Sequence, residues 1–549
     1  MSTHGPNEPE YLGAGAPEDA TGEDAFDLAG DHAPHGKAGR KAGRTGIVVG
    51  SAVAVVAAVG VGAYGVVQLM SGGSSPATAV PSDAIAYVSL DLDPSASQKI
   101  EAFKILRKFP GLKKEMGSRG DIRKAVFEAM QEGGDCKTLD YATDVEPWIG
   151  DRVAYAAVPD SLHGAAPLVV LQVTYPAKAE AGARVIEACS ADATGQQPGR
   201  TGISFVGDYM LLAETQREAN AFARDAQAAT LADDAAFTST TALAGDPGIL
   251  TMYVAKDAPR ALATALAQDT SSAGGSTVKG LDALEKQYKD FEGAAGVVRF
   301  RGGAVETELA GRGLPSSIAG AGAGPDTATL PATTAVALSV AFRDGWLKDY
   351  LGQLEAMAGS QQSMDELLAE GERETGLDLP EDVETLLGDG VSLAVDSSAD
   401  LEQLTSSPDP TTVPMGLRIH GDPAKIVPVI DKLKRLAGAD GDMVKVSTGD
   451  GVVAVGLQQS YVDRLLEKGD LGSVAAFRDV VPQPERASAA FYVNFDAGDW
   501  AEHLADVLSD DDAEIRSNVA PLDALGLSSW VDGEDGHEVA HALVRLTTD

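Results

Sequence analysis

The sequence has few cysteines and comparatively few basic residues. Only two cysteines occur among 549 residues, which excludes a disulfide-dense scaffold and a zinc ribbon built on cysteines. Lysine and arginine number 43 against 82 aspartates and glutamates, so the formal net charge is -39. Recognition of phosphates requires an excess of Lys and Arg, so we expect no nucleic-acid partner. The phosphate-binding loop and the Gly-x-Ser-x-Gly nucleophile elbow are also missing.

Long apolar runs are missing as well, except over residues 46–70. This stretch, GIVVGSAVAVVAAVGVGAYGVVQLM, has 25 residues and no charge. A helix needs about 20 apolar residues to cross a bilayer, whereas the apolar region of a cleaved signal peptide has about 7–15 and lies near the N-terminus. We therefore predict an uncleaved signal-anchor, a single transmembrane helix over residues 46–70 that binds the lipid bilayer.

The charges before this helix predict its orientation. Lys37, Arg40, Lys41 and Arg44 precede it, and basic flanks stay in the cytoplasm. We expect residues 1–45 to be cytoplasmic and the C-terminal domain to be extracellular, in a single-pass protein of the cell membrane. Residues 1–36 contain eight acids and no Lys or Arg, which predicts a disordered tail.

Both cysteines, Cys136 and Cys189, lie on the extracellular side of this prediction, where disulfides persist. Their separation of 53 residues is compatible with one bridge. Two unpaired thiols are the alternative. We favour the bridge because of the compartment.

Internal repeats are the most informative feature of the rest of the chain. LDYATDVEPWIGD at 139–151 and LDLPEDVETLLGD at 377–389 agree at seven of thirteen positions. Three shorter matches follow in the same order and at similar offsets: Pro176-Ala177-Lys178 with Pro423-Ala424-Lys425, Ala235-Ala236-Phe237 with Ala475-Ala476-Phe477, and Tyr253-Val254 with Tyr492-Val493. We predict two related halves, residues 81–313 and 331–549, joined by a Gly/Ala/Ser-rich flexible linker at 314–330.

Within each half, apolar segments of strand length alternate with helical patterns. Short turns, such as Val206-Gly207-Asp208-Tyr209, indicate antiparallel pairing. The fold class we predict is α+β, with an antiparallel sheet in each half and helices packed on one face. Four aspartates that follow strands and precede helices are interpreted as helix caps: Asp91, Asp257, Asp344 and Asp496.

The start of the extracellular part carries Pro81-Ser82-Asp83, Tyr87-Val88, Asp91-Leu92-Asp93-Pro94-Ser95 and Lys108-Phe109-Pro110. With the single apolar helix and the acidic tail, this pattern resembles an actinobacterial family of membrane-anchored proteins classed as a domain of unknown function. The resemblance covers residues 80–549. It implies placement in the membrane, and it implies no activity, cofactor or catalytic residue.

One segment matches a catalytic motif. His537-Glu538-Val539-Ala540-His541 fits H-E-x-x-H, in which a helix presents two imidazoles to zinc and a glutamate to water. Its surroundings favour a strand instead, because a Gly/Asp-rich turn precedes it and Ala542-Leu543-Val544-Arg545-Leu546 follows. On a strand, positions i and i+4 lie about 13 Å apart, too far for one zinc ion.

These observations predict a non-enzymatic extracytoplasmic domain that binds a partner or ligand, with no cofactor and no metal. The alternative is a zinc-dependent hydrolase that uses His537, Glu538 and His541. A purely structural envelope protein is the third reading.

Overall fold

A computed structural model describes eleven stretches of the chain and a few single residues between 123 and 131. The stretches are residues 74–92, 94–109, 139–160, 164–194, 201–269, 288–314, 327–358, 363–399, 410–499, 513–533 and 538–549. The predicted tail (1–45), the predicted membrane helix (46–70), Cys136, His537 and most of the predicted linker lie outside them. Among the residues described, none of the helices combines the length and the apolar character needed to span a bilayer.

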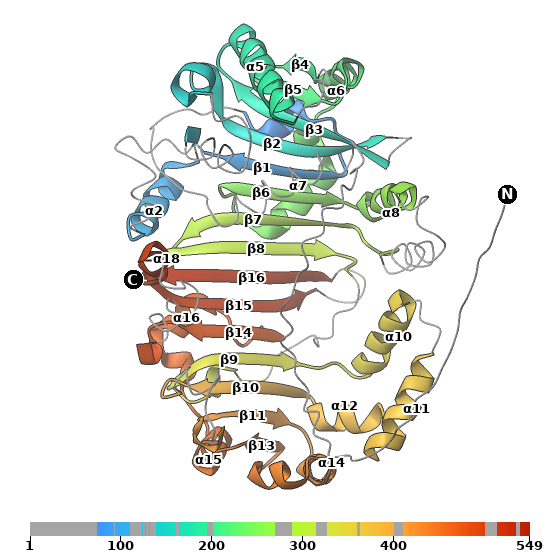
Figure 1. Ribbon diagram of the computed structural model, residues 1–549, viewed down its shortest axis with the longest axis vertical. Helices are drawn as coiled ribbons and strands as arrows, with labels where there is room; N and C mark the ends of the chain where they lie inside the picture. The colour runs from blue at the N-terminus through green and yellow to red at the C-terminus, as the bar shows by residue number, and fades with distance from the viewer. Residues whose placement is uncertain are drawn as a thin grey trace, which may run out of the picture. The chain divides into compact units, whose positions relative to one another are not determined.

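The described strands form one antiparallel sheet of sixteen strands (Figure 1). The order across the sheet is β12-β13-β11-β10-β9-β14-β15-β16-β8-β7-β6-β1-β2-β3-β5-β4. The first eight strands in chain order are β1 (Ala86–Asp91), β2 (Ile149–Asp160), β3 (Gly164–Val173), β4 (Gly202–Val206), β5 (Tyr209–Ala213), β6 (Leu250–Ala255), β7 (Gly293–Arg301) and β8 (Ala304–Arg312). The other eight are β9 (Thr334–Ala341), β10 (Gly390–Asp396), β11 (Met415–His420), β12 (Lys445–Gly449), β13 (Val452–Gly456), β14 (Ala489–Asn494), β15 (Leu522–Asp532) and β16 (Val539–Thr548).

The order of the strands is the same in the two parts of the chain. From the outer edge inward, the first eight strands run 4-5-3-2-1-6-7-8 and the other eight run 12-13-11-10-9-14-15-16. The last strand of each set meets the other at the middle, where β8 pairs antiparallel with β16. The α+β prediction with antiparallel pairing is confirmed. The prediction of a separate sheet in each half is corrected, because the pairing of β8 with β16 joins both sets of strands into a single sheet.

Local packing also repeats at the positions that match in the sequence. Phe237 packs edge-to-face on Tyr253 with ring centroids 5.0 Å apart, and Phe477 packs on Tyr492 in the same way at 5.1 Å. In the matching thirteen-residue segments, the backbone N–H of Asp140 donates to the Asp144 carboxylate, and that of Asp378 donates to Asp382. The repeated sequences therefore build the same contacts twice.

One face of the sheet is covered by short helices, and we call it the helix-covered face. In the first eight strands α6 (Gln216–Ala228) and α7 (Ala235–Thr241) pack over Tyr87, Ala154 and Tyr253. In the other eight α15 (Gln459–Leu466) and α16 (Ala475–Val480) pack over Ala337, Ala454 and Tyr492. Small strand residues dominate this side, so the helices approach the sheet closely. A capping box between Thr215 and Glu218 fixes the start of α6.

The opposite face carries helices mainly toward its ends, so the prediction of helices on one face is incomplete. Near β4 and β5, α5 (Pro176–Thr194) packs on Val173 and Met210 through a cluster that includes Trp148. The remaining helices are α2 (Ala96–Leu106), α8 (Ala258–Asp269), α10 (Trp346–Ala358), α11 (Met364–Thr375), α12 (Glu381–Leu387), α14 (Pro423–Leu436) and α18 (Ala513–Val519). Figure 1 looks onto this second face.

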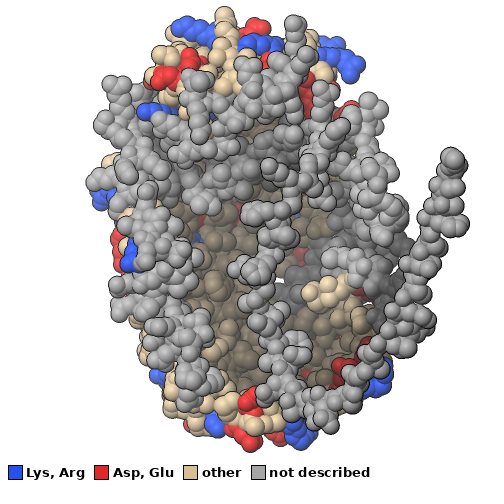
Figure 2. All heavy atoms as spheres, in the orientation of Figure 1, with Lys and Arg blue, Asp and Glu red and all other residues tan. Residues whose placement is uncertain are grey.

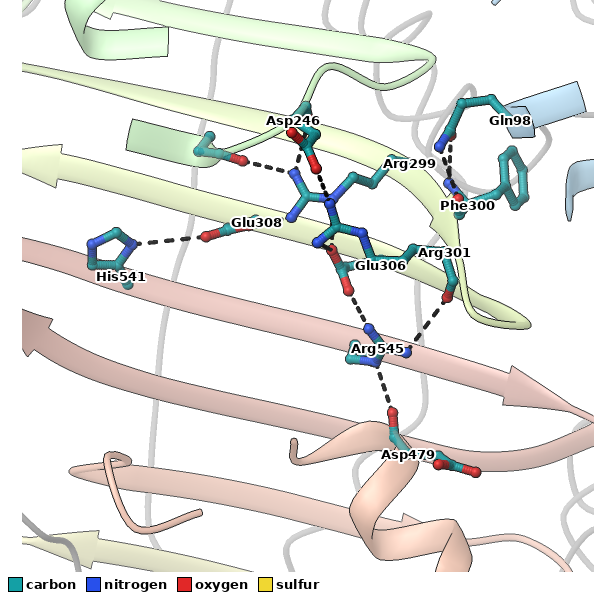
Figure 3. Close-up of polar contacts among 11 residues, drawn as sticks. Gln98, Asp246, Arg299, Phe300, Arg301, Glu306, Glu308, Asp479, His541 and Arg545 are labelled. Carbon is teal, nitrogen blue, oxygen red and sulfur yellow. Dashed lines mark hydrogen bonds and ion pairs between the residues drawn. The ribbon is translucent and has the colours of Figure 1, made fainter. Parts of the chain in front are cut away.

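A buried ion network lies on the helix-covered face at the junction of β7, β8 and β16 (Figure 3). Arg299 is 2% exposed, and its Nε donates to Glu306 at 2.6 Å while Nη2 binds Glu308. Arg299 also donates to the backbone carbonyl of Ala244, at 2.7 Å. The other carboxylate oxygen of Glu306 accepts from Arg545 on β16. One glutamate thus links a cation of the first set of strands to a cation of the second.

We expect Arg299→Ala to destabilise the protein by about 3–5 kcal/mol, because it leaves the buried carboxylate of Glu306 partly uncompensated. Lys104→Ala is the control. It removes an exposed pair with Glu101 and should cost at most about 1 kcal/mol. Urea unfolding followed by circular dichroism measures both variants, and equal midpoints would show that the network does not stabilise the junction.

Candidate functional site

The face opposite the helix-covered one carries aligned apolar side chains, and we call it the apolar face. Because residues of a strand alternate between faces, the register identifies its members. Six residues lie directly opposite one another on six adjacent strands, and we call them the second row: Leu417, Leu393, Leu338, Phe491, Leu527 and Val544. The equivalent first row is Val169, Tyr155, Val88, Met252, Gly296 and Leu309.

No charged side chain occurs on this face from β13 to β8 in the registers of the described strands. The neighbours of the second row are mostly aliphatic: Val336 and Val340 flank Leu338, and Val391 and Val395 flank Leu393. Polar side chains are limited to Ser529, Thr307 and, at the end of β16, Thr548. The charged strand residues of this region lie on the other face, where Arg299, Glu306 and Arg545 form the ion network.

Several leucines of the apolar face are open to solvent. Leu338 is 43% exposed, Leu527 37% and Leu417 36%. Leu309, at the end of the first row, is 43% exposed. Figure 2 looks onto this face. Where the described residues are visible, most of their atoms belong to uncharged residues, and Lys, Arg, Asp and Glu gather at the two ends. Exposed apolar patches on proteins are often binding sites, so this face is the candidate site.

Sequence reasoning missed these residues, although a signal was present. In Val336-Ala337-Leu338-Ser339-Val340 and in Val391-Ser392-Leu393-Ala394-Val395, large aliphatic residues alternate with small ones. Ala337 and Ala394 are fully buried in the cluster beneath α15 and α16. Close helix packing selects the small residues of a strand, so the large residues are the ones left on the other face.

The candidate zinc residues are not arranged as the H-E-x-x-H motif requires. Val539 begins β16, which contains His541, so the helix that would bring two imidazoles together is not formed. Glu538 precedes the strand and is exposed, while His537 lies outside the described residues. From Val539 to His541 the chain has the strand geometry that the flanking residues favoured.

His541 instead packs among aromatic and acidic side chains on the helix-covered face. Its ring stacks on Trp530 with centroids 5.1 Å apart, and Nε2 lies 3.7 Å from a carboxylate oxygen of Asp532. Nδ1 lies 3.9 Å from Glu308, beyond hydrogen-bond distance. Burial lowers the pKa of His541, against the effect of both carboxylates, so the imidazole is neutral at pH 7.

Three carboxylates meet where β14 ends and β15 begins. Asp496, Asp523 and Asp549 place one oxygen each within 4.8 Å of one another. Thr547 donates a hydrogen bond of 2.8 Å to Asp523. Burial raises the pKa of Asp496 to about 6, helped by a hydrogen bond and by repulsion from Asp549. This cluster can hold a proton at neutral to mildly acidic pH.

The predicted caps have mixed outcomes. Asp257 directly precedes α8, and its carbonyl accepts from the Ala261 N–H. Asp91 instead accepts from Arg152 Nε at 3.1 Å, and Asp496 belongs to the acidic cluster. Asp344 lies two residues before α10.

Cys189 lies on α5 and is disulfide-bonded. The only other cysteine of the chain, Cys136, falls outside the described residues. The pairing of Cys136 with Cys189 stays a prediction.

Asp496→Asn should stabilise the protein at pH 7.5. A carboxyl whose pKa is raised on folding contributes stability below its unfolded pKa of about 4, and that contribution is lost as the pH rises through about 6. The advantage of the variant should therefore vanish at pH 4. Asp382→Asn is the control with opposite sign, because Lys432 lowers the pKa of Asp382. Thermal melting at both pH values measures this, and a variant less stable at pH 7.5 would contradict the prediction.

Comparison with known proteins gives one match. Residues 48–199 match the model of a family described as "Protein of unknown function (DUF3352)". No curated protein and no solved structure matches the chain. The matched region begins within the apolar stretch 46–70 and ends in the residues that follow α5, so what this comparison identifies is a domain of unknown function.

Proposed function

We propose that the chain is a membrane-anchored, non-enzymatic binding protein whose extracytoplasmic domain holds an apolar ligand on the apolar face. The observation that carries this proposal is the exposure of Leu338, Leu417 and Leu527 on a sheet surface without charged side chains. A protein that is otherwise rich in charge, at -39 overall, leaves this surface uncharged. Solubility alone would favour charges there.

The chemistry of the face suits an apolar ligand. Its strands are interior to the sheet, so their backbone N–H and C=O groups pair with neighbouring strands and are not available to a ligand. The driving force is then the removal of apolar surface from water. Each buried methylene contributes about 0.8 kcal/mol, so a ligand that buries roughly ten carbon atoms gains about 8 kcal/mol before the cost of its ordering.

Membrane anchoring is supported by the sequence. Residues 46–70 contain no charge, and Lys37, Arg40, Lys41 and Arg44 precede them. The family match begins at residue 48 and continues into the strands of the sheet, so the apolar stretch and the folded part belong to one matched region. Anchoring outside the cytoplasm would keep the apolar face close to a supply of lipids.

Leu527→Asp should weaken the binding of an apolar fluorescent probe, anilinonaphthalene sulfonate, more than about tenfold, because it places a charge within the apolar face. Titration of the full-length chain held in amphipol measures the affinity. Leu262→Asp is the control, since this side chain on α8 is 53% exposed and lies outside the two rows. Equal probe affinities of the two variants would contradict the proposal.

The membrane anchor gives a separate prediction. Protease added to intact cells should remove residues beyond about 71 and leave the tail 1–45 protected. The reason is that the basic residues before the apolar stretch keep the N-terminus in the cytoplasm. A chain that lacks residues 46–70 should no longer sediment with membranes. Protection of the C-terminal domain would reverse the proposed orientation, and sedimentation of the shortened chain would remove the anchor.

A further inference from the structure

The two rows of the apolar face are equivalent in position but differ in what covers them. In the first row, Val88 and Met252 pack against a cluster that includes Ile105 and Leu106 of α2, together with Phe109 just beyond it. The middle of the first row therefore packs against side chains of the chain itself, from α2 and from neighbouring strands. Gly296, the next member of the row, has no side chain, and a Cβ there would meet Met252 at 2.7 Å and Leu309 at 2.5 Å.

The second row has no such filling among the residues that the structure describes. Leu338, Leu417 and Leu527 are exposed, and neither Leu393 nor Phe491 belongs to a packed cluster. On β10 and β11, Leu393 and Leu417 of the row lie between two packed clusters. These clusters contain the strand residues two positions before and two positions after them. On β10 and β11 one cluster takes Val391 and Ile419, with Ile426 of α14, and the other takes Val395 and Met415, with Val413.

We infer that the second row is the ligand site and that it binds one acyl chain of a membrane phospholipid across β11, β10, β9, β14, β15 and β16. This inference rests on the proposed function and adds the class of ligand and its place. Val88 and Met252, in the middle of the first row, pack against a cluster of the chain itself, so a single acyl chain is expected for each protein molecule.

The length of the row fits an acyl chain. Five steps between neighbouring strands, at about 4.8 Å each, give roughly 24 Å from Leu417 to Val544. Each leaflet of a bilayer contributes half of a hydrocarbon core about 30 Å thick, so an acyl chain needs roughly 15 Å. The row therefore accommodates a whole chain laid perpendicular to the strands.

The polarity of the row disfavours a peptide or a folded protein as the occupant. A protein interface carries about one hydrogen bond per 100–200 Å², and an added β-strand needs a free sheet edge. The strands of the second row are interior, and their side chains here are aliphatic or phenyl groups. An acyl chain requires neither hydrogen bonds nor an edge.

Photo-crosslinking tests the inference on the full-length chain. The protein is reconstituted in phosphatidylcholine vesicles that contain a small fraction of phosphatidylcholine with a diazirine on one acyl chain, and labelled peptides are mapped by mass spectrometry. We expect label on the strands of Leu338, Leu393 and Leu527. Leu338→Asp should reduce it more than about tenfold, and Leu338→Trp, which fills the row without a charge, should also reduce it. Leu436→Asp, at an exposed site on α14, should leave it unchanged.

The outcomes separate this inference from the proposed function. Label on the first row, at Val88 or Met252, or elsewhere on the apolar face would overturn the assignment to the second row and leave the function standing. An absence of label from all strands, while phosphatidylcholine labels residues 46–70, would overturn the assignment of a phospholipid. The proposed function would fall as well only if the probe titration gave equal affinities for Leu527→Asp and Leu262→Asp. A Leu338→Trp variant that melts like the parent protein but binds the lipid normally would also overturn the assignment.

Discussion

The antiparallel pairing of β8 with β16 is the interaction on which the rest of the architecture depends. Nine residue pairs join the last strands of the two sets, so that sixteen strands share one hydrogen-bonded surface. A slip of one residue in this register would move Glu306 and Arg545 to opposite faces and break their ion pair. The buried network around Arg299 therefore stabilises the register as well as the junction.

The junction also explains why the two faces of the sheet differ so much. Alternate residues of each strand point to opposite faces. Those on the helix-covered face have mostly small side chains, with charged residues gathered at the junction, whereas those on the apolar face are almost entirely aliphatic. Equivalent positions have diverged between the two sets of strands. Arg299 faces Glu306 where Trp530 faces His541, so an ion pair in one set corresponds to a stacked aromatic pair in the other.

The same divergence bears on the proposed binding site. In one set of strands, Val88 and Met252 of the row pack against a cluster that includes α2, whereas the equivalent row of the other set is exposed at Leu338 and Leu417. In a duplicated fold, one copy can contribute to stability and the other to binding. A row that packs against side chains of the same chain adds buried apolar surface to the core, whereas an exposed row is accessible to a ligand. The family match over residues 48–199 covers β1, β2 and β3 of the first set of strands and none of the second set.

Local and repetitive features could be predicted from the order of the residues. They are the α+β class, the antiparallel pairing, the segments that recur as Phe237 with Tyr253 and Phe477 with Tyr492, and the strand context of the H-E-x-x-H match. These follow from short-range patterns in residue spacing. The tertiary structure alone decided that the strands form one sheet, that Asp91 pairs with Arg152, and that six residues from six strands align into an open row. Such features depend on register between strands far apart in the chain, and no local pattern specifies that register.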